Sequence, residues 1–231
     1  MARVITLDAF GTLVELADPV PRLVDALAAR GAAVSAAQAG AALAEEIAFY
    51  RAHHDAGVDA ASLARLRERC AGVLRAGLER AGADVRAIAP AAIVESLLAA
   101  LRFRPFADVP GALAELRAAG HRLVVVSNWD VSLHEMLRTT GLAALVDGAI
   151  SSAEAGARKP DPAIFRSALA LAGRDDGRRA LHAGDSLALD VAGARAAGLD
   201  AVLVARGPVA DGVPPGVAVL GSLDGLASLA A

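Results

Sequence analysis

The sequence has little of several residue types, and each shortage excludes a class of protein. Its 231 residues include one cysteine, Cys70, so no disulfide can form within the chain, as expected of a protein in the reducing cytoplasm. No apolar run is long enough to cross a bilayer, and an acidic residue at position 8 interrupts the stretch where a signal peptide would be apolar. The formal net charge of −3 provides no basic surface, so we expect neither nucleic acid nor a membrane as a partner.

Lysine is also scarce. Lysine and arginine together number 23, and Lys159, directly before Pro160, is the single lysine among them. A compact ammonium fits where a planar guanidinium does not, so a lysine kept in an arginine-rich chain indicates a site with that requirement. The alternative is a solvated surface lysine, which is the usual place for this residue.

The stretch around Asp8 organises the rest of the chain. Val4–Leu7 is short, apolar and rich in β-branched residues, which predicts a buried strand. Asp8 follows directly, Gly11 allows a tight turn, and Thr12 brings a hydroxyl close to the carboxylate. Because ligands of open α/β sheets bind beyond the carboxyl ends of strands, Asp8 is a candidate functional carboxylate. A turn-former or helix cap is the alternative.

Three later apolar runs also end in polar residues, which are Ser127 with Asn128, then Lys159, then Asp185 with Asp190. This order resembles the haloacid dehalogenase-like (HAD) hydrolase superfamily, whose motifs run DxxGT, S/T, K and GDxxxxD. The four motifs extend from position 8 to position 190, so the resemblance covers nearly the whole chain. It implies a Rossmann-like core with an inserted cap and an aspartate nucleophile.

The pattern of elements in the second half of the chain predicts an α/β fold. From residue 109 onward strands alternate with helices, including an expected strand over 180–184 and an expected helix over 187–198. Such alternation favours parallel pairing with right-handed crossovers. We therefore predict a Rossmann-like, three-layer core built on a parallel sheet.

A block of helices interrupts this pattern after the first strand. Apolar residues recur at helical spacing in four segments, which are 19–31, 35–56, 61–82 and 90–101. We predict that the block is an all-α cap of residues 16–103, inserted into a core domain of residues 1–15 and 104–231. The hinges are expected near 14–18 and 103–108.

Asp8 and the last motif together could run phosphoryl transfer. A carboxylate can act as a covalent nucleophile, and Mg²⁺ held by one or two carboxylates would shield it from the substrate's charge. Asp8 and Asp185, both at strand ends, would share the ion, and the family resemblance adds the backbone carbonyl of Phe10. Asp190 would not bind the ion directly. It would orient the ligands of the ion, or Lys159, from behind them. The alternative for Asp185 and Asp190 is charge that favours a helix N-terminus.

The middle motifs could bind the transferring group. Ser127 and Asn128 end a predicted strand before a helix, where a hydroxyl and backbone amides can bind phosphate oxygens. An ordinary helix cap is the alternative, and both roles can hold together. Lys159 would neutralise Asp8 and the group in transfer.

Phe10 departs from the pattern of most HAD phosphatases, which carry a second aspartate two residues after the nucleophile. A phenyl ring cannot transfer a proton, and general acid–base help is worth about 10²–10⁴-fold in rate. The run from Asp8 to Leu13 resembles instead the opening motif of 2-haloacid dehalogenases, from which halide leaves without a proton. Gly184 and Asp185 resemble instead the last motif of the phosphatases, because those dehalogenases need no metal and usually lack this pair.

The predicted cap contains a polar cluster made of Tyr50, Arg51, His53 and His54. Either histidine could titrate near neutrality and replace the missing acid if the cap closes over Asp8. Arg51 could bind a substrate carboxylate or phosphate, or lie on the surface. The alternative for the histidines is a polar helix end near the C-terminal dipole.

Three functions stay open. We favour a Mg²⁺-dependent phosphatase that acts on a small phosphorylated metabolite through an aspartyl-phosphate at Asp8. The second is a metal-independent 2-haloacid dehalogenase, and the third is a non-catalytic binding protein with the HAD fold. Each takes a small-molecule ligand, and we expect a cytoplasmic monomer or homodimer.

Overall fold

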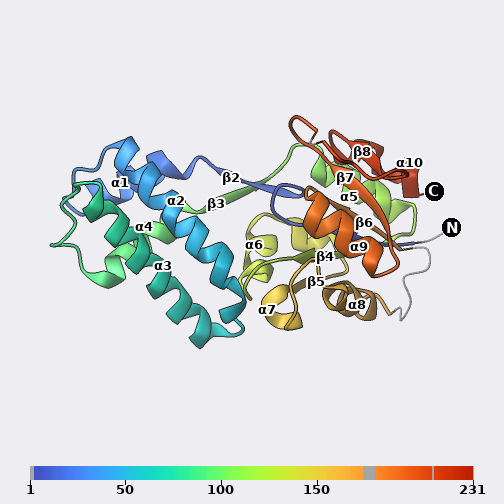
Figure 1. Ribbon diagram of the computed structural model, residues 1–231, viewed down its shortest axis with the longest axis horizontal. Coiled ribbons are helices and arrows are strands. Elements are labelled where there is room, and N and C mark those ends of the chain that lie inside the picture. Colours follow the sequence, from blue (N-terminus) through green and yellow to red (C-terminus); the bar gives the residue numbers. More distant parts are fainter. Residues whose placement is uncertain (1–2, 174–179, 210, 231) are drawn as a thin grey trace. The chain divides into compact units, whose positions relative to one another are not determined.

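The computed structural model describes residues 3–173, 180–209 and 211–230, and the chain divides into two compact units (Figure 1). Unit 1 comprises Met1–Glu15 and Arg104–Ala231, and unit 2 comprises Leu16–Phe103. The chain passes from unit 1 to unit 2 after residue 15 and returns after residue 103. That unit 2 acts as a cap stays a prediction.

Unit 1 is built on a six-stranded sheet in which every pairing is parallel. The order across the sheet is β5 (Gly148–Ser151), β4 (Arg122–Ser127), β1 (Val4–Leu7), β6 (Ala180–Gly184), β7 (Asp200–Val204) and β8 (Ala218–Leu220). β1 is central, and Leu7 lies opposite Val125 of β4 and Ala183 of β6. The carboxyl ends of these three strands therefore meet at one edge of the sheet.

Helices cover both faces of this sheet. Side chains of the strands alternate between the two faces, and the residues on both faces are buried. Val4, Val124 and Val126 pack with Ile164 and Phe165 in one cluster. The intervening residues of the same strands point to the other face and are buried too. The helices are α5 (Val109–Ala118), α6 (Leu133–Thr139), α7 (Ser152–Ala155), α8 (Pro162–Leu171), α9 (Ala192–Ala196) and α10 (Leu226–Ala230). The predicted three-layer, Rossmann-like α/β fold is confirmed.

Two expectations about local structure need correction. The segment expected as one helix over 187–198 opens with a π-helical turn, Leu187–Val191, before the α-helix α9. The predicted hinges contain two short strands, β2 (Val14–Ala17) and β3 (Arg102–Pro105), which pair as a separate two-stranded sheet. Four residues are too few to show a reliable alternation, and the proline and arginines of β3 argue against a strand.

Unit 2 consists of four helices and a single 3₁₀ turn, η1 (His54–Ala56). The helices are α1 (Pro19–Ala28), α2 (Ala36–His53), α3 (Ala60–Arg80) and α4 (Pro90–Ala100). Ser35 begins α2 with a capping box to Gln38, as expected from the sequence. Gly77 of α3 has no side chain, so α3 approaches α2 closely where a Cβ would lie 3.0 Å from Ala42.

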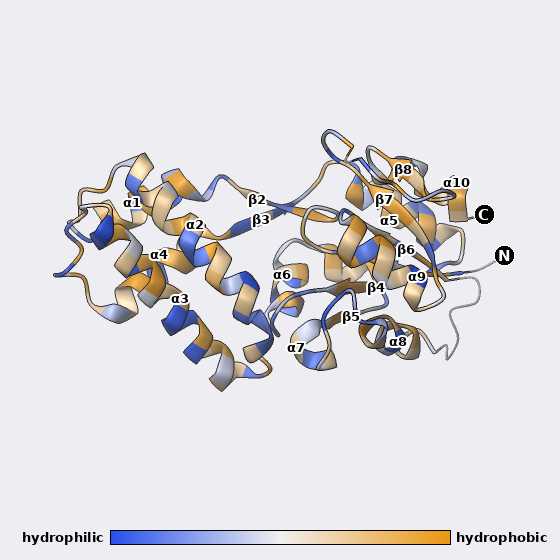
Figure 2. Ribbon diagram, in the orientation of Figure 1, coloured by the Kyte–Doolittle hydropathy of each residue, from blue (hydrophilic) through white to orange (hydrophobic). Residues whose placement is uncertain are grey.

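Hydropathy follows the burial of these elements. Figure 2 shows hydrophobic residues along β7 and mostly polar residues along β3. Cys70 of α3 is buried in the apolar cluster of unit 2. Among the helices of the described residues, none combines the length and apolar character that a bilayer crossing requires.

Candidate active site

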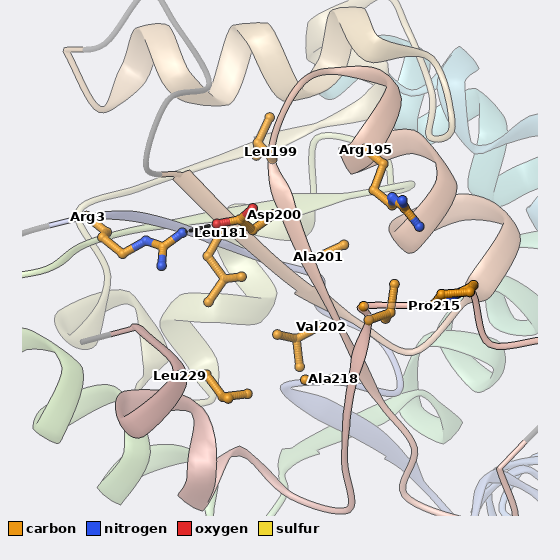
Figure 3. Close-up of a pocket in the computed structure, with 12 residues that line it drawn as sticks. Arg3, Leu181, Arg195, Leu199, Asp200, Ala201, Val202, Pro215, Ala218 and Leu229 are labelled. Atoms are coloured by element: carbon orange, nitrogen blue, oxygen red, sulfur yellow. Dashed lines mark hydrogen bonds and ion pairs between the residues drawn. The ribbon is translucent and has the colours of Figure 1, made fainter.

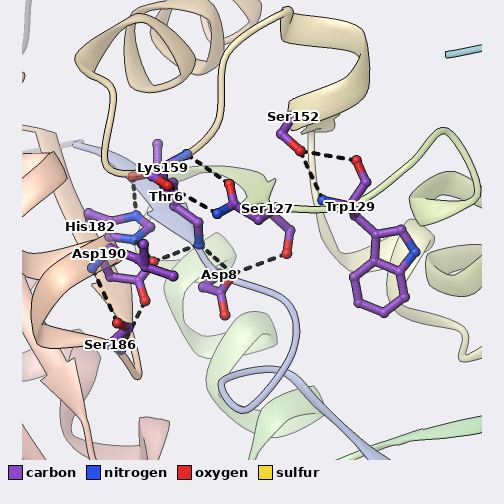
Figure 4. A network of polar contacts seen from close by, with 11 residues as sticks. Thr6, Asp8, Ser127, Trp129, Ser152, Lys159, His182, Ser186 and Asp190 are labelled. Carbon is purple, nitrogen blue, oxygen red and sulfur yellow. Dashed lines mark hydrogen bonds and ion pairs between the residues drawn. The ribbon is translucent and has the colours of Figure 1, made fainter. Parts of the chain in front are cut away.

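Asp8 lies at the carboxyl end of β1 and is 5% exposed. Its backbone amide donates to the carbonyl of Ala183 at 2.9 Å, which ties the turn after β1 to β6. Its carboxylate accepts hydrogen bonds from the Ser127 hydroxyl at 3.1 Å and from Lys159 Nζ at 2.5 Å, both on Oδ1 (Figure 4). The nucleophile candidate is therefore held through one of its two oxygens.

Lys159 is buried, with 2% of its surface exposed, so the solvated-lysine alternative is wrong. Its ammonium lies between two carboxylates, 2.5 Å from Asp8 Oδ1 and 2.6 Å from Asp190 Oδ1. The Asn128 side chain fixes the backbone of Lys159 from both sides. Its Oδ1 accepts from the Lys159 amide at 2.7 Å, and its Nδ2 donates to the Lys159 carbonyl at 3.1 Å. Asn128 thus positions the lysine; that it binds substrate stays a prediction.

Asp190 is buried and accepts hydrogen bonds from three donors. Oδ1 accepts from Lys159 and from His182 Nε2 at 3.0 Å, and Oδ2 accepts from the Ser186 amide at 2.9 Å. Gly184 makes room for this carboxylate, because a Cβ at that position would overlap the Asp190 carboxyl carbon. The structure therefore places Asp190 beside Lys159, as a residue that orients the ammonium.

Asp185 follows β6 and is exposed. One carboxylate oxygen each of Asp8, Asp185 and Asp190 lie within 4.8 Å of one another. Carboxylate oxygens are the donors that Mg²⁺ prefers in proteins. Because both oxygens of Asp190 already accept hydrogen bonds, Asp8 and Asp185 are the pair better placed to hold a cation. The donor set thus fits a hard divalent ion.

The charges of this cluster shift the pKa values of its members. Burial raises the pKa of Asp8 to about 6; Lys159 opposes this shift, and the charges of Asp190 and Asp185 add to it. Burial would also raise the pKa of Asp190, but Lys159 and His182 hold that pKa well below its usual range. Burial disfavours the charged form of Lys159, yet the two carboxylates raise the pKa of its ammonium above the ordinary value. Asp190 and Lys159 are thus a stable ion pair, and Asp8 is the carboxylate left short of positive charge.

Phe10 and Thr12 lie in the turn after Asp8. Phe10 is 40% exposed, and the role of its backbone carbonyl as a metal ligand stays a prediction. Thr12 is fully buried, and its hydroxyl has no hydrogen-bond partner within the described part of the chain. Its carbonyl accepts from Arg206 Nε at 3.1 Å and from Nη2 at 2.6 Å, which anchors the turn to the segment after β7. Thr12 therefore shapes the turn through its backbone.

The four polar residues predicted for the cap lie at the end of α2, in unit 2. His53 Nδ1 donates to the carbonyl of Phe49 at 2.8 Å, and the two rings stack at 4.1 Å. His54 is buried beside Asp55 at 2.8 Å, with the Tyr50 ring tilted against it, whereas Arg51 is exposed. These contacts are within unit 2, so their role toward a substrate stays a prediction.

His182 and its partner Thr6 were missed by sequence reasoning. His182 is fully buried in β6 and contacts both Asp190 and the Thr6 hydroxyl of β1, the latter at 2.9 Å. The available signal was a histidine inside an otherwise apolar strand, in the sequence Ala180 to Gly184. Such a residue must find polar partners when buried, and here one partner belongs to the last motif.

A separate hollow of about 320 Å³ lies beside β7 and β8 (Figure 3). Arg3 and Asp200 form an ion pair at its wall, and Arg195 and Leu229 also line it. Its lining within the described residues includes none of the predicted site residues. The site at the carboxyl ends of β1, β4 and β6 is therefore distinct from this hollow.

Replacing Gly184 with alanine is expected to lower turnover by about 10–100-fold, the range for residues that orient catalytic groups. The added Cβ would displace the Asp190 carboxylate and, with it, the ammonium of Lys159. Gly148→Ala is the matched control, because a Cβ at this other strand glycine meets nothing within 4 Å. Steady-state kinetics measure the turnover of both variants. Equal turnover of Gly184→Ala and Gly148→Ala would contradict this account of Gly184.

The aspartate pair and the buried lysine lie together at the edge of the parallel sheet where α/β proteins in general bind small ligands. The family model of haloacid dehalogenase-like hydrolases matches residues 2–198. The chain belongs to this family of hydrolases, as the resemblance of its motifs predicted.

Relatives and solved structures fall on both sides of the phosphatase–dehalogenase division. The chain is 40% identical over 146 residues to haloacid dehalogenase-like hydrolase domain-containing protein 3 of Bos taurus, which is 57% of this chain and 55% of that protein. It is 37% identical over 145 residues to a phosphoserine phosphatase of Thermus thermophilus, covering 61% and 55% of the two chains. The matches thus span about half the length of these relatives. A 2-haloacid dehalogenase structure from Pseudomonas syringae is 27% identical, with a TM-score of 0.68 over 99% of this chain and 98% of the other.

Proposed function

We propose that the protein is a Mg²⁺-dependent phosphatase that hydrolyses the phosphate ester of a small metabolite, with Asp8 as the nucleophile. The observation that carries this proposal is the group of three carboxylates, Asp8, Asp185 and Asp190, of which Asp8 and Asp190 share the ammonium of Lys159. Three carboxylates and one lysine leave an excess of negative charge where an anionic substrate must enter. A divalent cation at Asp8 and Asp185 offsets that excess. The relatives named as phosphatases support the same function.

The chemistry at Asp8 follows from its hydrogen bonds. Ser127 and Lys159 hold the carboxylate of Asp8 through Oδ1, and one oxygen of this carboxylate attacks phosphorus. The new O–P bond forms an aspartyl-phosphate as the ester O–P bond breaks, and the released alkoxide takes a proton from water. Water then attacks the phosphorus of the intermediate, giving inorganic phosphate and restoring Asp8. Bound Mg²⁺ would shield the negative charge of the phosphoryl group during these steps.

Ser127 and Lys159 would assist both steps. The lysine ammonium holds Asp8 in place and offers positive charge next to the phosphoryl oxygens. The Ser127 hydroxyl lies on the same carboxylate and is within reach of a group bound there. Phe10 stands where a general acid is usual, so substrates with good leaving groups should be hydrolysed best.

The alternative is a 2-haloacid dehalogenase that forms an ester at Asp8 as halide departs. Phe10 favours this reaction, because a halide leaves without a proton and needs no acid at that position. The 27% identical dehalogenase structure supports it as well. Asp185 argues against it, since the reaction has no use for a divalent cation. That the chain is a cytoplasmic monomer or homodimer stays a prediction.

The deciding experiment follows phosphate release from p-nitrophenyl phosphate and a panel of phosphorylated metabolites, and chloride release from 2-chloropropionate, with Mg²⁺ or with EDTA. We expect phosphate release that requires Mg²⁺, and we expect Asp185→Asn to raise the Mg²⁺ concentration needed by about 10–100-fold. Asp211→Asn, which removes an exposed carboxylate, is the control. Chloride release that survives EDTA would establish the dehalogenase instead. Inactivity in every assay would favour the binding protein.

A further inference from the structure

His182 occupies an unusual place for an imidazole. It is fully buried in the middle of β6, next to the central strand, where Thr6 of β1 is its partner in register. The Phe165 ring stands edge-on to it, with the centroids 5.0 Å apart. A polar ring in such an apolar layer costs free energy unless both of its nitrogens find partners.

Both ring nitrogens of His182 do have partners. Nε2 lies 3.0 Å from Asp190 Oδ1, and Nδ1 lies 2.9 Å from the Thr6 hydroxyl oxygen. The Asp190 carboxylate only accepts hydrogen bonds, so Nε2 must carry a proton. In the neutral ring Nδ1 is then an acceptor, and the Thr6 hydroxyl, which also lies 3.4 Å from the carbonyl oxygen of Leu181, donates to it at 2.9 Å. Thr6 therefore stabilises the tautomer in which His182 donates to Asp190.

This chain of hydrogen bonds ends at the candidate nucleophile. Asp190 Oδ1 accepts from His182 and from Lys159, and Lys159 donates in turn to Asp8 at 2.5 Å (Figure 4). The ammonium sits between two carboxylates, so any rotation of Asp190 changes its distance to Asp8. His182 is thus linked to Asp8 through Asp190 and Lys159.

We propose that Thr6 and His182 are positioning residues that set the orientation of Lys159 through Asp190, and so determine the rate of the reaction at Asp8. The proposal rests on the proposed function, because it assigns these residues to that same site. They would act on turnover and leave substrate affinity nearly unchanged, since both side chains are fully buried. Groups that orient a catalytic ligand in this way typically contribute 10–100-fold, roughly, to activity.

The test uses variants that differ in one hydrogen bond. Thr6→Val removes the hydroxyl with little change in shape and is expected to lower kcat about tenfold, with KM within about twofold. Thr6→Ser keeps the hydroxyl and should have a kcat close to that of the wild type. His182→Phe is expected to cost about 100-fold in kcat, and His182→Gln, which keeps an N–H donor, should recover part of it. His121→Phe removes another buried histidine, bonded to the Arg3 amide, and should leave kcat unchanged.

A second readout does not depend on activity. Nitrogen-15 NMR of the imidazole should show a protonated Nε2 and a bare Nδ1 in the wild type, and a mixture of tautomers in Thr6→Val. A wild-type protonated at Nδ1 alone, or a Thr6→Val variant with full kcat, would overturn the proposal. A wild type inactive on every phosphate ester and haloacid would overturn the proposed function and the effect on kcat. The NMR measurement would then still show whether Thr6 controls the tautomer of His182.

Discussion

Asp8→Asn is expected to lower turnover by at least about 10⁴-fold, the scale of loss when a covalent nucleophile is removed. An amide oxygen is a far weaker nucleophile than a carboxylate, and when it accepts from Lys159 the other position is taken by an amide nitrogen, which cannot attack. Phosphate release under saturating Mg²⁺ measures the loss. Residual turnover above about 1% of the wild-type value would show that the nucleophile is a residue other than Asp8.

The same substitution is also expected to change how the free energy of unfolding depends on pH when no metal is bound. The pKa of folded Asp8 is about 6, above its ordinary 3.8, so the folded state binds the proton more tightly than the unfolded state. The resulting stabilisation is complete below about pH 4 and is lost as the pH rises through about 6. From pH 4 to pH 8 in EDTA, wild type should therefore lose about 2 kcal/mol relative to Asp8→Asn. Urea unfolding across this range tests it, and parallel curves would contradict the raised pKa.

Lys159→Met is expected to lower turnover by about 10³-fold and to destabilise the protein by about 3–5 kcal/mol. The buried ammonium is shared by Asp8 and Asp190, and its removal leaves two buried carboxylates without a counter-charge. Lys159→Arg should not restore activity, because the planar guanidinium is larger and the side chain is enclosed.

A double variant separates the two effects of losing the lysine. Lys159→Met with Asp190→Asn removes one of the stranded charges and should recover part of the stability without recovering turnover. Urea unfolding and phosphate release are measured on the same samples. A Lys159→Arg variant with wild-type turnover would show that positive charge alone suffices at this position.

The sequence predicted this site because three of its four motifs directly follow the end of a strand, whereas Lys159 lies between α7 and α8. β6 ends at Gly184, as expected, and Asp185 follows at the edge where Asp8 also lies. The parallel order of β4, β1 and β6 then brings Ser127 beside Asp8 without further information. Strand-end residues are predictable because the topology of the sheet decides which of them meet.

Other parts of the site were beyond sequence reasoning. Thr6 and His182 are 176 residues apart, and nothing local indicates that their side chains share a hydrogen bond. The side-chain amide of Asn128 hydrogen-bonds to the backbone of Lys159, which sequence spacing cannot show. The raised pKa of Asp8 depends on how many charges surround it once folded. Each of these properties belongs to the packed structure rather than to a motif.

The burial of Lys159 has a consequence for chemical labelling. It is the single lysine of the sequence, so it carries the one side-chain amine of the chain. Reagents that acylate amines find that amine enclosed, with 2% of the residue exposed and the nitrogen engaged by two carboxylates. The rate of acylation at Lys159 therefore reports how often the site opens, and a ligand that closes the site should slow it. A surface built on arginine leaves this measurement free of background from other lysines.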